Sequence, residues 1–247
     1  MSLQNTSVPV MVRPEDALPG RDTPILSSPK QHTVLGTDIF SLPQNMEQIY
    51  LAAGCYWGVE EIFWQTPGVY TTSVGFMGGY TPNPTYKEVC TGLTGHTETV
   101  RVVFNPEEIS AAEILQIFFE CHDPTSLYRQ VGDIGTQYRS AIFFTSQKQK
   151  LTISKMILQY QEVLKQAGKG EIVTEVSPAV SHAFYPAEDS HQQYLQKNPD
   201  GYRCHSKSGL PCPLPGSGPL AELSTNPDAT SITTSVKRTN TNFLKLN

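Results

Sequence analysis

Residues 49–63 read IYLAAGCYWGVEEIF, and this stretch decides the fold around a single cysteine. The apolar run at 49–53 is typical of a buried strand, and Gly54 ends it. Apolar residues then recur at helical spacing up to Phe63. The stretch therefore predicts a strand, a tight turn and a helix, with Cys55 in the first turn of that helix.

The predicted position of Cys55 favours a reactive thiol. The backbone N–H groups in the first turn of a helix lack partners within the helix, and together with the helix dipole they stabilise an anion. An ordinary thiol has a pKa of about 8.5, and lowering that pKa by about two units makes it mostly ionised at pH 7. We therefore expect a thiolate at Cys55. Inert packing is the alternative, because free cysteine is among the most buried residue types, but the glycine turn favours a nucleophile.

The same periodicities predict the remaining core elements. Strands are expected at 69–77, 96–104 and 141–145. Ser110 and Glu113 form a capping-box pattern, which starts a helix that runs to about Cys121. A longer helix is expected from about Ser146 to a C-cap at Gly168. Polar loops are expected at 78–84 and 123–138.

These elements predict an α+β fold, a two-layer α/β sandwich with a ferredoxin-like core, a mixed sheet and irregular termini. Prolines gather near both ends of the chain, and the composition after residue 219 turns to Ser, Thr and Asn. Such a composition buries too little apolar surface to fold. We expect an extended arm over residues 1–44, one folded domain over 45–215 and a disordered tail over 216–247.

Composition and charge exclude several classes of protein. The chain has 247 residues, of which 38% are hydrophobic and 17% charged, as in an ordinary globular protein. Its net charge of -5 offers no basic face for nucleic acid or an anionic membrane. No apolar run approaches the roughly 18 residues that span a bilayer, and the first residues lack the features of a targeting segment. Five scattered cysteines argue against a disulfide framework, so we expect a cytoplasmic protein with reduced thiols.

Glu98 is the candidate proton donor. On a strand at 96–104, period-two alternation places it on the same face as Val100, Val102 and Phe104. A carboxyl among apolar side chains loses water, which raises its pKa and makes it a general acid near neutral pH. A carboxylate paired with an arginine at the end of a strand is an equally good reading of the residues alone.

Four residues in or next to the polar loops could supply hydrogen bonds around a developing charge: Tyr86, Asp133, Tyr138 and Arg139. None of them is specific alone, because a tyrosine in a loop more often covers surface than takes part in catalysis.

The remaining cysteines differ in their surroundings. Cys204 and Cys212 lie in a segment rich in glycine and proline, which we expect to pack poorly and to suit thiol exchange. A zinc site of these two cysteines with His205 is the alternative, but the paired Cys-x-x-Cys spacing of such sites is missing. Cys121 is expected in the core, on the apolar face of its helix, and Cys90 is expected to be structural.

Four motifs together resemble peptide methionine sulfoxide reductase, type A. They are GCYWG at 54–58, GHTE at 95–98, GDIGTQYRS at 132–140 and YPAED at 185–189. The motifs extend over about residues 50 to 200, and ALPGR at 17–21 is similar to the arm of longer bacterial-type members. The resemblance implies a catalytic domain that reduces the S epimer of methionine sulfoxide, free or in peptides and proteins, and so repairs oxidised proteins.

The resemblance also implies roles for single residues. Cys55 attacks the sulfoxide sulfur and Glu98 protonates its oxygen; a resolving thiol then condenses with Cys55, and further exchange passes the disulfide outward to thioredoxin. From their place in a segment that we expect to be mobile, we assign Cys204 as the first resolving thiol and Cys212 as the second. The substrate-binding residues that it implies are Tyr56, Trp57, Tyr86, Asp133 and Tyr138. It implies neither a metal nor another cofactor, and we expect a monomer with no nucleic-acid or membrane partner.

Two positions depart from the pattern of this family. Tyr56 stands where phenylalanine is usual, which adds a hydroxyl that needs a partner, and Arg203 is inserted before Cys204 where related long forms often go from tyrosine to cysteine. Two other functions stay open from the residues: a binding module with a decayed thiol site, and a cysteine hydrolase that uses Cys55 with a histidine base. Only a reductase consumes a thiol reductant for each sulfoxide turned over.

Overall fold

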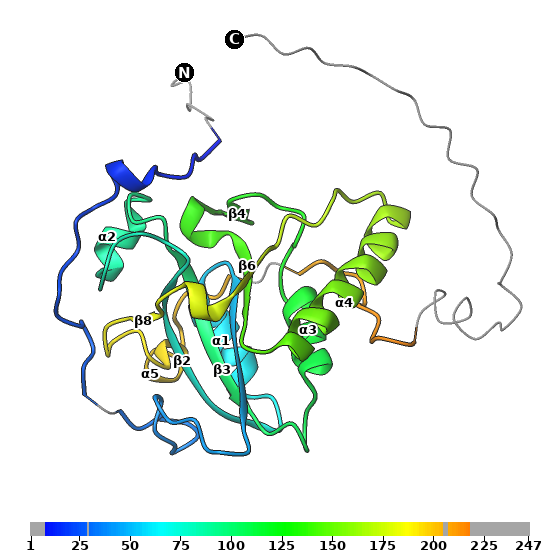
Figure 1. Ribbon diagram of the computed structural model, residues 1–247, viewed down its shortest axis with the longest axis horizontal. Helices are drawn as coiled ribbons and strands as arrows, with labels where there is room; N and C mark the ends of the chain where they lie inside the picture. Colours follow the sequence, from blue (N-terminus) through cyan, green and yellow to red (C-terminus); the bar gives the residue numbers. More distant parts are fainter. Residues whose placement is uncertain (1–7, 29, 205–206, 218–247) are drawn as a thin grey trace, which may run out of the picture.

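The computed structural model describes residues 8–28, 30–204 and 207–217, and a six-stranded sheet forms its centre (Figure 1). The strands lie in the order β7-β6-β1-β3-β2-β8, and neighbours are antiparallel except β6 and β7, which are parallel. The sheet strands are β1 Glu47–Ala53, β2 Val69–Met77, β3 Thr97–Phe104, β6 Ser140–Phe144, β7 Glu175–Pro178 and β8 Tyr185–Pro186. A separate hairpin consists of β4 Arg129–Gln130 and β5 Asp133–Ile134.

The helices α3 Ala111–Glu120 and α4 Gln147–Gln166 have the caps that the sequence predicts. The other helices are α1 Tyr56–Trp64, α2 Tyr86–Cys90 and α5 Tyr194–Lys197, with short 3-10 helices η1 Pro14–Asp16, η2 Thr136–Tyr138 and η3 Ala179–Ser181. The expected capping box is present, since Ser110 and Glu113 accept each other's backbone N–H groups. Ser146 caps α4, and Gly168 follows its end with a φ of +72°. None of the helices in the described ranges has the length and apolar content to cross a bilayer.

The core lies between the sheet and the three helices α1, α3 and α4. Alternate residues of the central strands face these helices, and the buried cluster includes Leu51, Phe76 and Phe104 from strands and Phe63 and Phe118 from helices. The path β1-α1-β2-β3-α3-β6, with the spatial order β6-β1-β3-β2, is the ferredoxin-like arrangement. The predicted fold class, a two-layer sandwich on a mixed sheet, is confirmed.

Irregular chain covers the opposite face of the sheet. Ala52, Met77 and Phe143 form a smaller buried cluster there, against which Phe184 packs. Arg101 also faces this side, and its guanidinium donates to the carbonyl of Ile39 at 2.9 Å. The chain just before β1 therefore contacts the sheet, since Arg101 also donates to the carbonyl of Ser41 at 3.0 Å, while the earlier part of the arm runs along the outside of the molecule (Figure 1).

Several short elements were not predicted from the sequence. The loop expected at 123–138 contains β4, β5 and η2, and no element was expected where β7, β8 and α5 lie. Elements of two to four residues are too short for a hydrophobic period to be visible. The helix α2 was missed as well, although Thr85 and Glu88 carry the pattern of a capping box. From residue 218 onward, the expected tail lies outside the described residues.

Gly75 gives a test of the packing between β2 and β8. A methyl group there would collide with the carbonyl oxygen of Tyr185 and would lie 2.7 Å from the Phe184 ring, so Gly75→Ala should push β8 away from the sheet. We expect the free energy of unfolding to fall by about 1–3 kcal/mol, as for other overpacked sites. Gly132→Ala is the matched control, because nothing lies within 4 Å of a methyl group at that position. Equal denaturant midpoints for the two variants would contradict this packing.

Candidate active site

Cys55 lies at the junction of β1 and α1, where it is the N-cap residue of the helix. Gly54 has a φ of +92°, which favours glycine, so the predicted tight turn is present. Cys55 is only 6% exposed. Burial raises the pKa of its thiol, the charge of Glu98 raises it further, and the backbone N–H of Trp57 lowers it. The expectation of a resting thiolate is wrong, because the loss of water outweighs the helix N–H groups.

Glu98 lies beside Cys55 because β1 and β3 are antiparallel neighbours. The last residues of β1 and the first residues of β3 therefore lie at the same end of these two strands. Glu98 is 1% exposed, and its Oε2 accepts the backbone N–H of Tyr56 at 3.0 Å. Burial raises the pKa of the carboxyl to about 8, although the Tyr56 N–H opposes this rise. No ion pair to Glu98 occurs within the described ranges, so the salt-bridge reading is wrong. Arg139 pairs instead with Glu175 at 3.0 Å.

Aromatic rings gather around Trp57, next to the cysteine. Tyr194 stacks on the Trp57 ring at 4.0 Å between centroids, and Tyr86 stacks on it at 6.1 Å. The indole N–H of Trp57 donates to Nδ1 of His191 at 3.1 Å, and His191 lies 4.3 Å from the Tyr86 ring. Sequence reasoning missed His191 and Tyr194, because no spacing links positions so far along the chain to Trp57.

Tyr56 backs this ring cluster from inside the core. Its side chain is 1% exposed, its ring lies 5.8 Å from that of Phe76, and burial raises the pKa of its hydroxyl. In the described part of the chain, the hydroxyl has no hydrogen-bond partner. The partner that this hydroxyl was expected to need is therefore missing among the described residues.

The two other tyrosines predicted for the site also lie near the carboxyl. Burial raises the pKa values of Tyr86 and Tyr138, and the charge of Glu98 is the second cause for both hydroxyls. The charge of Asp133 acts on Cys55, Glu98 and Tyr138 alike, so this carboxylate lies within the same group. The structure thus brings these residues together, although Tyr86 begins α2 and does not lie in a loop.

Cys204 lies against the first turn of α1. A methyl group at Gly58 would be 3.4 Å from the Cys204 carbonyl oxygen, and the Cys204 sulfur lies 3.7 Å from the carbonyl oxygen of Gln130. The charge of Cys204 is among the influences on the pKa of Cys55. These contacts place the second sulfur in the neighbourhood of the first.

Arg203 holds this segment to the helix α1. Its guanidinium forms a two-pronged ion pair with Glu61 of α1, at 2.9 and 3.0 Å, and donates to the carbonyl of Pro199 at 2.6 Å. On the other side, the Tyr202 hydroxyl donates to the Asp133 carboxylate at 3.2 Å. Two polar contacts therefore hold the chain directly before Cys204.

Cys212 is buried, so the expectation of poor packing around it is wrong. It is 1% exposed, and burial raises the pKa of its thiol to about 12. Its backbone N–H donates to Glu120 Oε1 at 2.8 Å, and its carbonyl accepts from Gln116 Nε2 at 2.7 Å. Leu210 packs nearby against the core, where its carbonyl accepts the Tyr160 hydroxyl at 3.1 Å. The prolines and glycines of this segment fit around α3 and do not leave it loose.

The structure also describes the two cysteines that were not assigned to the reaction. Cys90, which was expected to be structural, is exposed. Cys121 packs beside the core as expected, and burial raises its pKa to about 12. No group of three or more potential metal ligands occurs in the part of the chain that the structure describes, and His205 of the zinc alternative lies outside that part.

Comparisons with known proteins bear directly on this arrangement. A family model described as peptide methionine sulfoxide reductase matches residues 47–210. Peptide methionine sulfoxide reductase MsrA of Corynebacterium efficiens is 51% identical over 205 residues, covering 83% of this chain and 94% of that protein. Peptide methionine sulfoxide reductase MsrA 1 of Synechocystis is 49% identical, covering 83% and 91%.

A solved structure has the same fold. Methionine sulfoxide reductase A of Corynebacterium diphtheriae superposes with a TM-score of 0.75 at 47% identity, covering 84% of this chain and all of that one. The matched family segment includes Cys55, Glu98 and the residues gathered around them. The chain belongs to the peptide methionine sulfoxide reductase family.

Proposed function

We propose that this protein reduces the S epimer of methionine sulfoxide, free and in peptides and proteins, to methionine. The observation that carries the proposal is the buried pair of a thiol and a carboxyl with a raised pKa, Cys55 and Glu98, beside a cluster of aromatic rings. A sulfoxide needs a thiol to attack its sulfur and a proton for its oxygen, and this pair supplies both. The Trp57 ring is suited to hold the S-methyl group.

The first step transfers one oxygen atom from the substrate to Cys55 and moves two protons, one from Glu98 and one from the thiol. Glu98 donates its proton to the sulfoxide oxygen as the Cys55 sulfur attacks, and the carboxylate that remains takes the proton of the thiol. The oxygen then leaves the substrate sulfur and bonds to the Cys55 sulfur, while the transient bond between the two sulfurs breaks. The products are methionine and a sulfenic acid on Cys55. We assign the hydroxyls of Tyr86 and Tyr138, whose pKa values are raised by burial and by the charge of Glu98, as hydrogen-bond donors to the same oxygen.

Later steps return Cys55 to the thiol. Cys204 attacks the sulfenic acid, which forms a disulfide and releases water, and Cys212 then displaces Cys55 from that disulfide. The position of Cys204 against α1 supports the first of these assignments. Since Cys212 is buried, its exchange requires the segment around it to open. We infer that thioredoxin, as a dithiol reductant, reduces the final disulfide, and that the protein works as a monomer in the cytoplasm.

The alternative functions fit less well. A hydrolase needs a histidine base on its cysteine, and within the described residues Cys55 has no hydrogen bond to a histidine. A binding module has no use for a buried carboxyl whose pKa is raised to about 8.

Cys55→Ser tests the nucleophile. A serine hydroxyl does not attack sulfoxide sulfur and carry away its oxygen, so the variant should release no methionine, even with dithiothreitol. Chromatography of both sulfoxide epimers after reaction measures this. Wild-type protein should consume the S epimer and leave the R epimer, and equal rates on both would contradict the pocket. Cys121→Ser is the matched control and should keep full activity.

Glu98→Gln tests the proton donor. The amide keeps the shape but cannot transfer a proton, so methionine release at pH 7 should slow by about 10²- to 10⁴-fold. In wild type, the pKa of about 8 keeps the acid form below that pH, so the rate should fall as pH rises through about 8. The variant should lack this alkaline limb in single-turnover measurements without reductant. A variant with nearly full activity would rule out Glu98 as the donor.

The relay is tested by removing each later cysteine. Cys204→Ser should still release about one methionine per enzyme without reductant and should leave a sulfenic acid on Cys55 that dimedone traps. Cys212→Ser should stop at a Cys55–Cys204 disulfide and lose most thioredoxin-driven turnover, while small dithiols rescue it. Peptide mapping by mass spectrometry identifies these species. A Cys55 disulfide with Cys90 or Cys121 in oxidised wild type would show that the order is wrong.

A further inference from the structure

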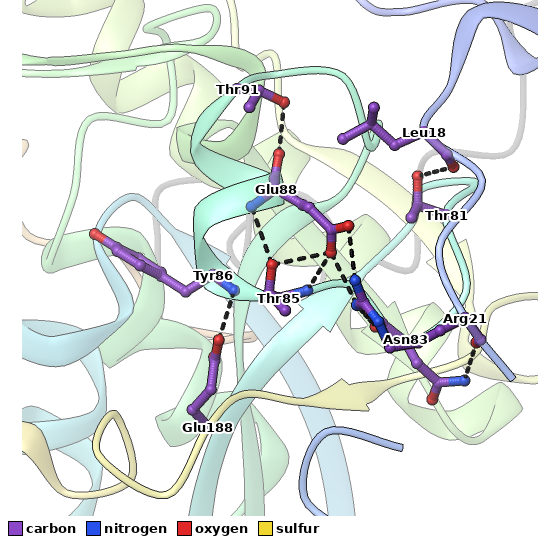
Figure 2. A network of polar contacts seen from close by, with 9 residues as sticks. All are labelled: Leu18, Arg21, Thr81, Asn83, Thr85, Tyr86, Glu88, Thr91 and Glu188. Carbon is purple, nitrogen blue, oxygen red and sulfur yellow. Dashed lines mark hydrogen bonds and ion pairs between the residues drawn. The ribbon is translucent and has the colours of Figure 1, made fainter. Parts of the chain in front are cut away.

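The chain before β1 is fastened to the segment that carries Tyr86. In this arm the Leu18 backbone N–H donates to the carbonyl of Leu93 at 3.0 Å. The Leu18 carbonyl accepts the Thr81 hydroxyl at 2.8 Å (Figure 2). The Arg21 N–H donates to the carbonyl of Pro82 at 3.0 Å. The arm therefore forms backbone hydrogen bonds with the chain that precedes α2 and with the chain that follows it.

The Arg21 side chain provides the strongest of these contacts. Its guanidinium forms a two-pronged ion pair with the Glu88 carboxylate, at 2.8 and 2.9 Å, and donates to the Asn83 carbonyl at 2.6 Å (Figure 2). The Asn83 amide donates back to the Arg21 carbonyl at 2.8 Å. Asn83 has a φ of +46°, a left-handed conformation that the contacts on both of its sides hold in place. The hydrogen bond from Arg21 is the largest cause that lowers the pKa of Glu88 to about 2.

Glu88 in turn fixes the start of α2. Its Oε2 accepts the Thr85 backbone N–H at 2.8 Å and the Thr85 hydroxyl at 2.9 Å, which completes a capping box. The helix has only five residues, and an isolated helix of that length is unstable in water. Tyr86, its first residue, is held on the other side by Glu188, whose Oε1 accepts the Tyr86 N–H at 3.0 Å. The orientation of Tyr86 thus depends on external anchors, and Arg21 is the anchor that the arm provides.

We propose that Arg21 is a positioning residue for sulfoxide reduction: by pairing with Glu88 it holds α2 so that the Tyr86 hydroxyl reaches the substrate oxygen. This inference rests on the proposed role of Tyr86. Gly20 fits the same view, because a methyl group there would collide with Pro82 and separate the arm from this segment.

A double-mutant cycle tests the proposal in the full-length protein. The measured quantity is the rate of methionine release from S-sulfoxide in a single turnover without reductant, which separates this step from the relay. Since a misplacement of about 1 Å can cost up to about 10²-fold in rate, we expect Arg21→Ala to slow release by about tenfold. In a Tyr86→Phe background, the same change should slow it less than about twofold, because the hydroxyl to be positioned is gone.

Two further variants control for folding and charge. Arg21→Lys keeps the positive charge but not the two-pronged contact, so its rate should lie between wild type and Arg21→Ala. Arg13→Ala removes another arginine of the arm, whose ion-pair partners among the described residues are Glu15 and Asp16, and should leave the rate unchanged. Melting temperatures of all variants show whether a loss of rate reflects unfolding at the assay temperature.

Each outcome decides one question. Equal losses from Arg21→Ala in the wild-type and Tyr86→Phe backgrounds would overturn the proposal, as would a wild-type rate in Arg21→Ala or in Tyr86→Phe. A wild-type protein that releases no methionine would instead overturn the proposed function itself.

Discussion

The hydrogen bond from the Tyr56 backbone N–H to the Glu98 carboxyl, at 3.0 Å, is the contact on which the site depends. It joins the start of β3 to the first turn of α1, directly after Cys55. The antiparallel pairing of β1 and β3 brings these two ends together, and the core between the sheet and α1 keeps them there. The proton donor is therefore fixed next to the nucleophile by backbone geometry, before any substrate binds.

Burial then decides the protonation of both groups. Each loses most of its water, and each lies close to the negative charges of the site, so the neutral forms are favoured at pH 7. A neutral thiol is protected from adventitious oxidation, because the thiolate is the form that reacts. The sulfoxide itself supplies what the resting site lacks: an acceptor for the Glu98 proton. In this account, substrate binding and activation of Cys55 are coupled through one carboxyl.

Local patterns allowed much of this arrangement to be predicted from the sequence. The capping box at Ser110, the tight turn at Gly54 and the burial of Glu98 each depend on residues a few positions apart. The raised pKa of Cys55 and the packing of Cys212 against α3 did not follow, because both depend on residues brought together by the whole fold. Helices and strands of two to five residues show no period, and they became visible only through their tertiary contacts.

The central claim is that Glu98 is protonated in the resting protein at neutral pH. Infrared difference spectroscopy measures it directly, because a protonated carboxyl has a C=O stretching band that a carboxylate lacks, and the loss of that band in Glu98→Gln assigns it. The account predicts that the band is present at pH 7 and is lost with a midpoint at about pH 8. A band that is absent at pH 7, with a midpoint near the ordinary glutamate pKa of about 4.3, would contradict it.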